Sequence, residues 1–396
     1  MSKRMIGCLT ALLGLTAACC EPSVTVRVPD LDIRRLPLPE NEALAFTRKM
    51  TMGINLGNTF DAVDDSLTGD DLLLESRWVG VKTTKALIEE IYSAGFRTLR
   101  IPVSWHNHVD ENFQIGKAWL DRVQEVVDWA YEKGMYVILN THHDLGARYY
   151  YPDRAHLESG ARYLSAVWTQ LALRFRDYGE RLLFESMNEP RCSGTPYEWN
   201  YEADNPGCVE GLECINRFNQ VFVDTVRACG GENARRYLMI PSYAAAAVSA
   251  LEDVFRLPED SVPGRLIVST HAYIPYSFAL QDGGTRSYSM DPDGPQAGEI
   301  TSVLDGLYRK YILNGIPVIM GEFGARDKDN LPDRVNFTAQ YTSLASARCI
   351  PCVWWDNHSF RGNGERFGLI DRSRAEWKYP EIVEALARYS GYERLK

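Results

Sequence analysis

Eight short apolar segments recur along the chain, and segments with helical spacing separate them. The apolar segments are MGINLG (52–57), FRTLRIPV (96–103), YVILNTH (136–142), RLLFESMNE (181–189), RYLMIPS (236–242), LIVSTHAY (266–273), PVIMGEFG (317–324) and CVWWDN (352–357). Each is almost continuously apolar, which is typical of strands that are buried on both faces of a parallel sheet. This pattern constrains the fold more than any other feature of the sequence.

The intervening segments predict helices. Residues 82–95 place Leu87, Ile91 and Ala94 on one face and stop at Gly95, a common helix terminator. Similar segments lie at 118–134, 161–179, 210–228, 297–313, 333–347 and 379–389, and the helix after the fifth strand is the least clear. Eight strand–helix units predict an α/β fold, a (β/α)8 TIM barrel, as one catalytic domain over 43–396. A doubly wound sheet is the alternative, but GINLGN lacks the glycine fingerprint of a dinucleotide site.

The first 20 residues predict a secretory signal peptide. Lys3 and Arg4 precede an apolar run over 5–18, which is too short for a transmembrane helix. The run ends in Ala17-Ala18-Cys19-Cys20, which resembles a bacterial lipobox with Thr16 where leucine is usual. We therefore expect an exported lipoprotein of the outer membrane or cell surface, lipidated on Cys19 or Cys20; an ordinary cleavage site is the alternative. The proline-rich segment 21–42 would then be a tether.

Charge and cysteine content narrow the function further. The net charge is −10, from 53 acidic and 43 basic residues, which argues against a nucleic-acid partner. Nothing demands an oligomer, so we expect a monomer. Beyond the signal lie six cysteines, at 192, 208, 214, 229, 349 and 352. A disulfide among the first three is compatible with export, although its pairing stays open. We interpret Cys349 and Cys352 as core or disulfide cysteines.

Polar and aromatic side chains gather where the predicted strands end, which is where barrel enzymes place their catalytic groups. Glu189 and Glu322 stand out, because each ends an apolar run. Two carboxyls that face one cleft suit cleavage of a glycosidic bond: one protonates the leaving oxygen, and the other attacks or activates water. Arg100 would keep the attacking carboxylate ionised. The alternative is that each glutamate is the structural partner of an arginine.

Several motifs resemble glycoside hydrolase family 5, most closely its subfamily 4 of endo-β-1,4-glucanases and xyloglucanases. They are GINLGNTFDA, GFRTLRIPVSW, ILNTHHD, FESMNEPR, HAYIPYSF, VIMGEFG, and VWWDN followed by FGLIDR. The resemblance runs from about residue 45 to the C-terminus. It implies a retaining double displacement, with the two carboxyl groups ~5 Å apart.

The resemblance also implies a role for each matching residue. These are Glu189 as acid/base; Asn188 at the sugar 2-hydroxyl; Glu322 as nucleophile; Arg100 as the cation beside it; His142 and His143 in the floor of the site; His271 beside the acid/base; Tyr273 beside the nucleophile; and Trp355, with Trp354 as the alternative, under the sugar ring.

Other residues carry weaker signals. Asn58 and Asp61 match sugar-binding positions of the family, but either can simply form a turn. Trp78, Trp105 and His106 are further candidates for substrate contact, with packing as the alternative. The long loop after the fourth strand, with Tyr197, Trp199 and Tyr201, either extends the positive subsites or packs on the barrel.

We expect no metal and no cofactor. His142, His143 and Asp144 are too close in sequence to bind one ion together, and neither a zinc-protease motif nor a serine-hydrolase elbow occurs. Glu185, inside the fourth strand, is predicted to be structural and paired with an arginine or a histidine.

The sequence thus predicts a retaining endo-β-1,4-glucanase whose partner is a polysaccharide or oligosaccharide. Xyloglucan is the first choice of substrate, because a lipid anchor without a separate binding module suits soluble chains. Cellulose chains and mixed-linkage glucan follow. A β-mannanase of the same family is the alternative enzyme, and a surface glycan-binding protein without activity is the alternative of another class.

Overall fold

The computed structural model describes residues 26–67 and 72–396, and its centre is a closed barrel of eight parallel strands. Each strand pairs with the next one along the chain, and the eighth pairs with the first. The strands are β1 (Met52–Asn55), β2 (Thr98–Ile101), β3 (Tyr136–Asn140), β4 (Leu182–Glu185), β5 (Leu238–Ala246), β6 (Leu266–His271), β7 (Val318–Phe323) and β8 (Cys352–Trp354). Seven predicted apolar segments contain a strand in full and the fifth covers the first part of β5, so the predicted TIM barrel is confirmed.

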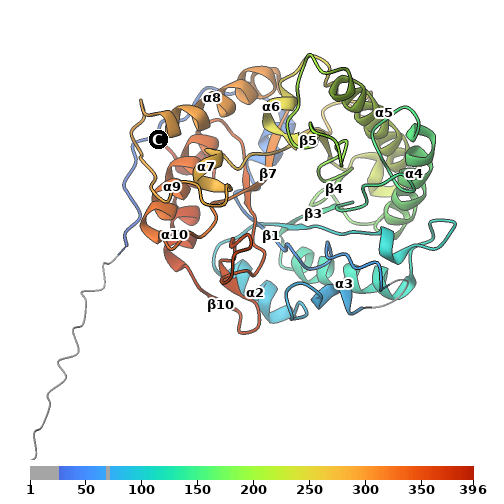
Figure 1. Cartoon of the computed structure of the whole chain (residues 1–396), viewed down its shortest axis with the longest axis horizontal. Coiled ribbons are helices and arrows are strands. Elements are labelled where there is room, and N and C mark those ends of the chain that lie inside the picture. The colour runs from blue at the N-terminus through green and yellow to red at the C-terminus, as the bar shows by residue number, and fades with distance from the viewer. Residues whose placement is uncertain (1–25, 68–71) are drawn as a thin grey trace, which may run out of the picture.

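Helices surround the strands, as Figure 1 shows. The longer ones are α2 (Lys85–Ser93), α3 (Lys117–Glu132), α4 (Leu157–Arg174), α5 (Pro206–Ala228), α8 (Pro295–Lys310), α9 (Leu331–Ala347) and α10 (Pro380–Tyr389). The segment after β5 forms only α6 (Ala247–Ala250), which explains why its helical pattern is weak. Short elements complete the chain: α1 (Glu42–Thr47), α7 (Tyr276–Ala279), a hairpin of β9 (Ile370–Asp371) and β10 (Glu376–Trp377), and 3-10 turns at Leu74–Ser76, His106–His108, Gly231–Ala234, Ile312–Asn314 and Tyr392–Arg394.

Helix α2 illustrates how local sequence sets these bounds. The Thr84 hydroxyl caps the helix by accepting the Leu87 N–H at 3.2 Å. Leu87 and Ile91 lie on the face that packs against the barrel, and both are buried. The chain leaves the helix at Gly95, whose φ of 104° favours glycine. The predicted helix therefore ends at the predicted glycine.

A second apolar cluster closes the end of the barrel where the strands begin. Phe46 in α1 stacks on Tyr237, with ring centroids 3.9 Å apart, and meets Tyr136 edge to face. Ile138, Leu183 and other inward-facing strand residues complete the cluster. Helix α1 thus acts as a plug that keeps water out of the barrel interior.

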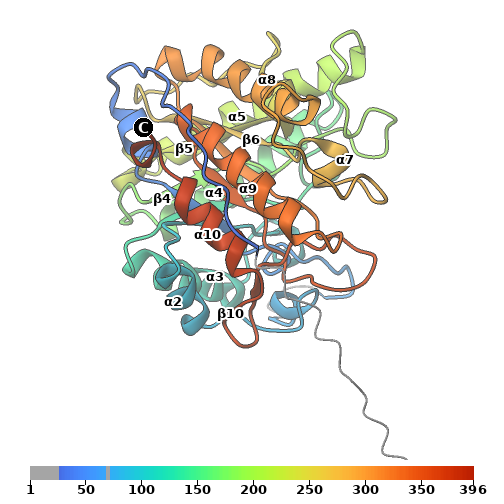
Figure 2. The same ribbon diagram turned by 90° about the vertical axis from the view of Figure 1, so that its left-hand side faces the viewer.

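Residues 26–41 form no regular element, yet they are docked on the barrel. The Tyr389 hydroxyl donates to the Pro29 carbonyl at 2.6 Å, and the Arg35 N–H donates to the Lys396 carbonyl at 2.9 Å. Figure 2 shows this segment beside α10. From residue 26 onward the predicted tether is therefore part of the folded domain, because hydrogen bonds and the buried Val28 fix it there. The rest of the tether, the signal and the lipobox lie outside the described residues.

Two sequence expectations concern membranes and thiols. Among the residues that the structure describes, no helix has the length and apolarity that crossing a membrane requires. All six cysteines of that region are free thiols, so the disulfide considered for Cys192, Cys208 and Cys214 is not formed. Cys349 and Cys352 are buried in the apolar core, in agreement with their interpretation as core residues.

Replacing Phe46 tests the plug. Phe46→Ala should lower the free energy of unfolding by about 3 kcal/mol, because it removes a buried ring and leaves a cavity. Urea unfolding measures the change. Leu173→Ala, at an exposed position on α4, is the control and should change stability by less than about 0.5 kcal/mol. An equal effect of the two substitutions would contradict the assigned role.

Candidate active site

The carboxyl ends of the eight strands meet at one mouth, and the polar side chains collected from the sequence meet there. Glu185 ends β4, and Asn188 and Glu189 follow it. His271 ends β6, and Glu322 lies one residue before the end of β7. The pairing of β7 with both neighbours shifts register next to Glu322, so the strand departs from a regular ladder where this carboxylate is displayed.

Arg100 in β2 lies at the centre of a buried hydrogen-bond network. Its Nη1 donates to Glu322 Oε1 at 2.8 Å and to Asn55 Oδ1 at 2.9 Å. Its Nη2 donates to Asn188 Oδ1 at 2.7 Å, and its Nε donates to Glu185 Oε2 at 2.8 Å. Although burial opposes the charge, the carboxylates of Glu185 and Glu322 raise the pKa of Arg100, so the guanidinium is a permanent cation.

Glu185 has the structural role that the sequence predicts. It is buried, and it accepts hydrogen bonds from Arg100, from Asn140 Nδ2 at 3.0 Å and from the Ser269 hydroxyl. Its two carboxylate oxygens are thereby satisfied inside the barrel. Glu185 faces no open space at the mouth, and its charge balances that of Arg100.

Glu189, His271 and Glu322 form a compact group at the mouth. His271 Nδ1 lies 2.7 Å from Glu189 Oε1 and 3.8 Å from Glu322 Oε1. A carboxylate oxygen of each glutamate and a His271 nitrogen all lie within 4.8 Å of one another. The Tyr273 hydroxyl donates to Glu322 Oε2 at 2.8 Å. This spacing fits two carboxyls that act on one glycosidic bond with retention, since inverting pairs leave room for a water between them.

The protonation of this group follows from its contacts. Burial works against ionisation of Glu189, but the hydrogen bond and charge of His271 outweigh burial and hold the pKa of Glu189 below its ordinary value. Burial raises the pKa of Glu322, although His271 and Arg100 oppose that effect. The two carboxylates in turn raise the pKa of His271, against the effect of burial. These directions favour an ionised Glu189 beside a protonated His271.

Trp355 and His142 form a parallel pair of rings beside the carboxyls. Their planes differ by 2° and their centroids are 5.8 Å apart. Burial lowers the pKa of His142 well below its usual range, so the imidazole is neutral. Trp355 keeps 7% of its surface exposed, whereas Trp354 keeps none and donates its indole N–H to the Phe367 carbonyl. Trp355 is thus the tryptophan that can face a sugar, and the alternative, Trp354, belongs to the core.

The weaker candidates divide into two groups. Asp61 is buried and accepts the backbone N–H groups of Asn58 and Thr59, so it shapes the turn that follows β1. Trp105 is buried as well, with its indole N–H on the Asn140 carbonyl. Neither offers a free polar atom to the mouth, which supports the turn and packing interpretations.

His143, Trp78 and His106 keep exposed surface. The His143 ring lies 5.9 Å from Trp78, which is 44% exposed, and 4.5 Å from His142. His106 is partly exposed and its Nδ1 lies 2.9 Å from Asp144 Oδ1. Asn58 is partly exposed too, with φ of 59°. The rings of Trp78, His143 and His142 thus form one continuous group that starts beside Trp355.

Sequence reasoning missed a buried arginine that braces the mouth. Arg372 donates to Asp356 Oδ1 at 2.6 Å, to the Gly57 carbonyl at 2.9 Å and to the Thr59 hydroxyl at 2.7 Å. It therefore ties the end of β8, next to Trp355, to the turn after β1. A side chain at Gly57 would lie 2.7 Å from the Trp355 ring, so glycine is required there. The FGLIDR motif includes Arg372, but no spacing rule gives its partners.

Two groups of side chains in the described part of the chain could hold a metal ion. One is Asp61, His142 and His143, and the other is Glu189, His271 and Glu322; in each group the ligand atoms lie within 4.8 Å of one another. The first group differs from the His142–His143–Asp144 run considered from the sequence, because Asp144 instead pairs with His106. Every member of both groups already has a hydrogen-bonding or stacking partner at the mouth.

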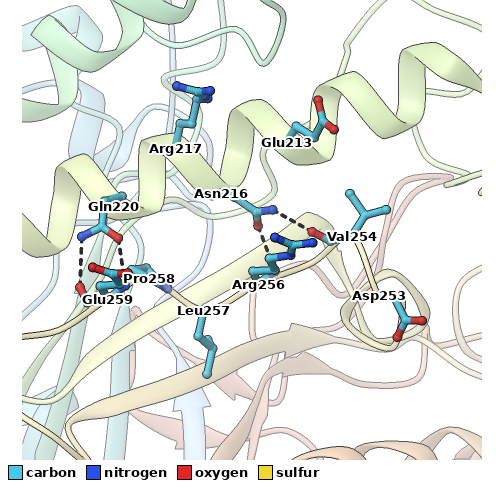
Figure 3. Close-up of a pocket in the computed structure, with 10 residues that line it drawn as sticks. All are labelled: Glu213, Asn216, Arg217, Gln220, Asp253, Val254, Arg256, Leu257, Pro258 and Glu259. Atoms are coloured by element: carbon cyan, nitrogen blue, oxygen red, sulfur yellow. Dashed lines mark hydrogen bonds between the residues drawn. The ribbon is translucent and has the colours of Figure 1, made fainter.

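Another concavity lies outside the barrel, between α5 and the loop after α6. Its volume is about 690 Å³. Figure 3 shows that the side-chain amides of Asn216 and Gln220 bond across it to the Val254 and Glu259 carbonyls. None of its lining residues is aromatic, so it lacks the flat surface on which a sugar stacks.

Comparisons with known proteins agree with this geometry. The profile of the cellulase family, glycosyl hydrolase family 5, matches residues 60–361. Endoglucanase B of Ruminococcus albus is 43% identical over 357 residues, which are 89% of this chain and 82% of that protein.

Solved structures match over almost the whole chain. A family 5 lichenase from Caldicellulosiruptor sp. F32, in the complex of a mutant with cellotetraose, has a TM-score of 0.90 and 50% identity, covering 92% of this chain and all of that one. A xyloglucan-specific endo-β-1,4-glucanase from a metagenomic library has a TM-score of 0.79 and 35% identity, covering 87% and 98%. Broad specificity endoglucanases of GH5-4 match at 35–41% identity.

Replacing Glu185 tests its structural role. Glu185→Gln should lower the free energy of unfolding by about 3 kcal/mol or more, because it removes one partner of a buried ion pair. Denaturant unfolding measures this change. Glu322→Gln, at the partly open end of the same network, is the matched control and should destabilise the protein less. A Glu185→Gln protein as stable as the wild type would contradict the assignment.

Proposed function

The chain belongs to glycoside hydrolase family 5, and from this premise we propose that the protein is a retaining endo-β-1,4-glucanase that cleaves internal bonds of β-1,4-linked glucans. One observation carries the proposal. Glu189 and Glu322 approach each other within 4.8 Å, and only Glu322 receives hydrogen bonds from both Arg100 and Tyr273. Burial raises the pKa of Glu322, but the Arg100 charge and the Tyr273 hydrogen bond oppose burial and favour the ionised form that a nucleophile needs.

The first step forms a bond between Glu322 and the anomeric carbon of the sugar. As that bond forms, the glycosidic C–O bond breaks, and Glu189 transfers its proton to the departing oxygen. His271 Nδ1 lies 2.7 Å from Glu189 Oε1, and because the pKa of His271 is raised and that of Glu189 is lowered, His271 holds the proton and passes it to Glu189 for this transfer. Arg100 and Tyr273 hold Glu322 in place for the attack.

The second step releases the sugar from Glu322. Glu189, now ionised, takes a proton from water, and the water oxygen attacks the anomeric carbon as the bond to Glu322 breaks. The leaving carboxylate regains its hydrogen bonds from Arg100 and Tyr273. Arg100 Nη2 donates to Asn188 Oδ1 at 2.7 Å and so orients this side chain. The amide nitrogen of Asn188 is then placed to bond the 2-hydroxyl of the sugar.

The substrate proposal rests on two exposed tryptophans and on the similar proteins. Trp78 and Trp199 are exposed tryptophans on loops that follow strand ends, which suits contact with several sugar rings. The similar structures include a lichenase with cellotetraose and a xyloglucan-specific enzyme. We propose xyloglucan first, then cellulose chains and mixed-linkage glucan.

Hydrolysis assays with a nucleophile variant test the function. Reducing-sugar release from xyloglucan, carboxymethyl cellulose and mixed-linkage glucan should exceed release from mannan, and the β-anomer should appear first by NMR. Glu322→Ala should reduce activity by ~10⁴-fold or more, because no covalent intermediate can form. Activity that survives in Glu322→Ala, or first release of the α-anomer, would contradict the mechanism.

Export and lipidation are a second proposal. Its support is the charged start, the apolar run of 5–18 and the small residues before Cys19 and Cys20. A lipid anchor would hold the enzyme at a membrane while soluble chains reach it.

Metabolic labelling with a fatty acid tests the anchor. The expressed full-length chain should incorporate label and partition with membranes, whereas a Cys19→Ser/Cys20→Ser double variant should remain in the aqueous fraction. Cys229→Ser, which changes a thiol inside the folded domain, is the control. A wild-type chain without label would overturn the proposal.

A further inference from the structure

Three of the large apolar side chains that remain exposed in the described residues are aromatic, and each follows the end of a barrel strand. They are Trp78 after β1, Trp199 after β4 and Tyr276 after β6. The fully buried aromatic rings are far more numerous. Exposed rings confined to the catalytic end of a barrel indicate contact with a ligand rather than packing.

Trp199 has an unusual support. Its inner face stacks on the Arg191 guanidinium, with the central carbon 3.7 Å from the ring centroid, and 56% of the residue stays exposed. Glu198 fixes the arginine through a 3.0 Å bond to Nε, and its other oxygen accepts the Gly194 N–H at 2.9 Å. The ring is thus held flat against a clamped cation while its outer face is open.

The same arginine contacts the acid/base residue. Arg191 Nη1 donates to the main-chain carbonyl of Glu189 at 2.9 Å. Burial opposes the low pKa of Glu189. His271 has the larger lowering effect, and the charge of Arg191 lowers this pKa further. Trp199 and Glu189 are therefore linked through a single side chain.

The barrel topology identifies the side of the cleft on which this group lies. Trp355 follows β8 and Trp199 follows β4, and these strands are four positions apart in a closed barrel of eight. Figure 1 agrees, since α4 and α5, which flank β4, lie opposite α9 and α10, which flank β8. If Trp355 lies under the sugar that Glu322 attacks, Trp199 lies beyond Glu189, where the leaving chain departs.

We propose that Trp199, Arg191 and Glu198 form a platform for the leaving part of the substrate: the outer face of Trp199 takes a β-glucosyl ring beyond the cleaved bond, and Arg191 holds the main chain of Glu189 in register with it. The proposal rests on the proposed function and deepens it. Arg191 is a positioning residue that acts through Glu189, and Trp199 is a binding residue for one side of the substrate.

Two substrates separate this role from a general structural one. Cellopentaose places sugars on both sides of the cleaved bond, whereas an aryl β-cellobioside has only a phenol beyond it. Trp199→Ala should lower kcat/KM for cellopentaose roughly tenfold, as the loss of one stacked ring predicts, and change that for the aryl cellobioside less than about twofold. Trp129→Ala, which removes a tryptophan stacked with Arg122 on the outside of α3, is the matched control and should change neither. Equal losses on both substrates, or no loss on either, would overturn the proposal.

The pH profile tests Arg191. The charged and titratable groups that interact with Glu189 are His271, Glu322, Arg100, Arg191, His143, Tyr150, Tyr273 and Glu365. Arg191→Gln removes one cation that favours ionised Glu189, so the basic limb of kcat/KM should move to higher pH. Arg191→Lys keeps the charge but loses the planar group that stacks on Trp199. The basic limb of the pH profile should therefore stay in place, while kcat/KM for cellopentaose falls. Arg154→Gln, at an exposed position after β3, is the control. An unmoved limb in Arg191→Gln would overturn the role of Arg191.

Binding to an inactive variant keeps this test separate from that of the proposed function. Calorimetry with Glu322→Ala should show cellopentaose binding that weakens several-fold when Trp199→Ala is added. Weakened binding together with an inactive wild type would refute the hydrolase and retain the platform. Unchanged binding together with an active wild type would refute the platform alone.

Discussion

The guanidinium of Arg100 is fully enclosed, and the arrangement of the active site depends on it. A buried cation without partners is strongly unfavourable, and the removal of either member of a buried ion pair costs several kcal/mol. Four side chains satisfy this one: Glu185, Glu322, Asn55 and Asn188. They come from three strand ends: Asn55 from β1, Glu185 and Asn188 from the end of β4 and the turn after it, and Glu322 from β7. Because a guanidinium is planar, each partner is fixed in direction as well as in distance.

This network gives different roles to Glu185 and Glu322, two glutamates with similar surroundings. Glu185 balances the charge from inside the barrel, and Glu322 takes the remaining donor at the mouth, where Tyr273 supplies a second hydrogen bond. His271 then places its contact on Glu189 instead. The two proposed catalytic carboxyls, Glu189 and Glu322, thus differ because Arg100 donates only to Glu322. The pairing of β7 shifts register beside Glu322, where the strand brings this carboxylate to Arg100.

The sequence predicts the barrel and a candidate catalytic pair because both leave local signals. Continuous apolar segments mark strands buried on both faces, and a glutamate at the end of such a segment is conspicuous. Contacts that join distant segments leave no such signal: Arg372 to Gly57, Arg191 to Trp199, and the docking of residues 26–41 all depend on the folded shape. Composition also misleads where prolines suggest a free tether. Trp354 ends β8 and Trp355 follows it, and successive side chains of an extended chain point to opposite sides, so only the register decides which of the two faces the mouth.

The docked N-terminal segment has a mechanical consequence. Residues 29–37 bond to the end of α10 and to the final residues of the chain, including Arg35 to the Lys396 carbonyl. A force applied to the chain ahead of this segment would load these bonds first, one after another. The barrel strands, which carry the active site, would feel tension only after the segment had peeled away. Tension on the N-terminal side of the domain would therefore reach this segment before it reached the barrel.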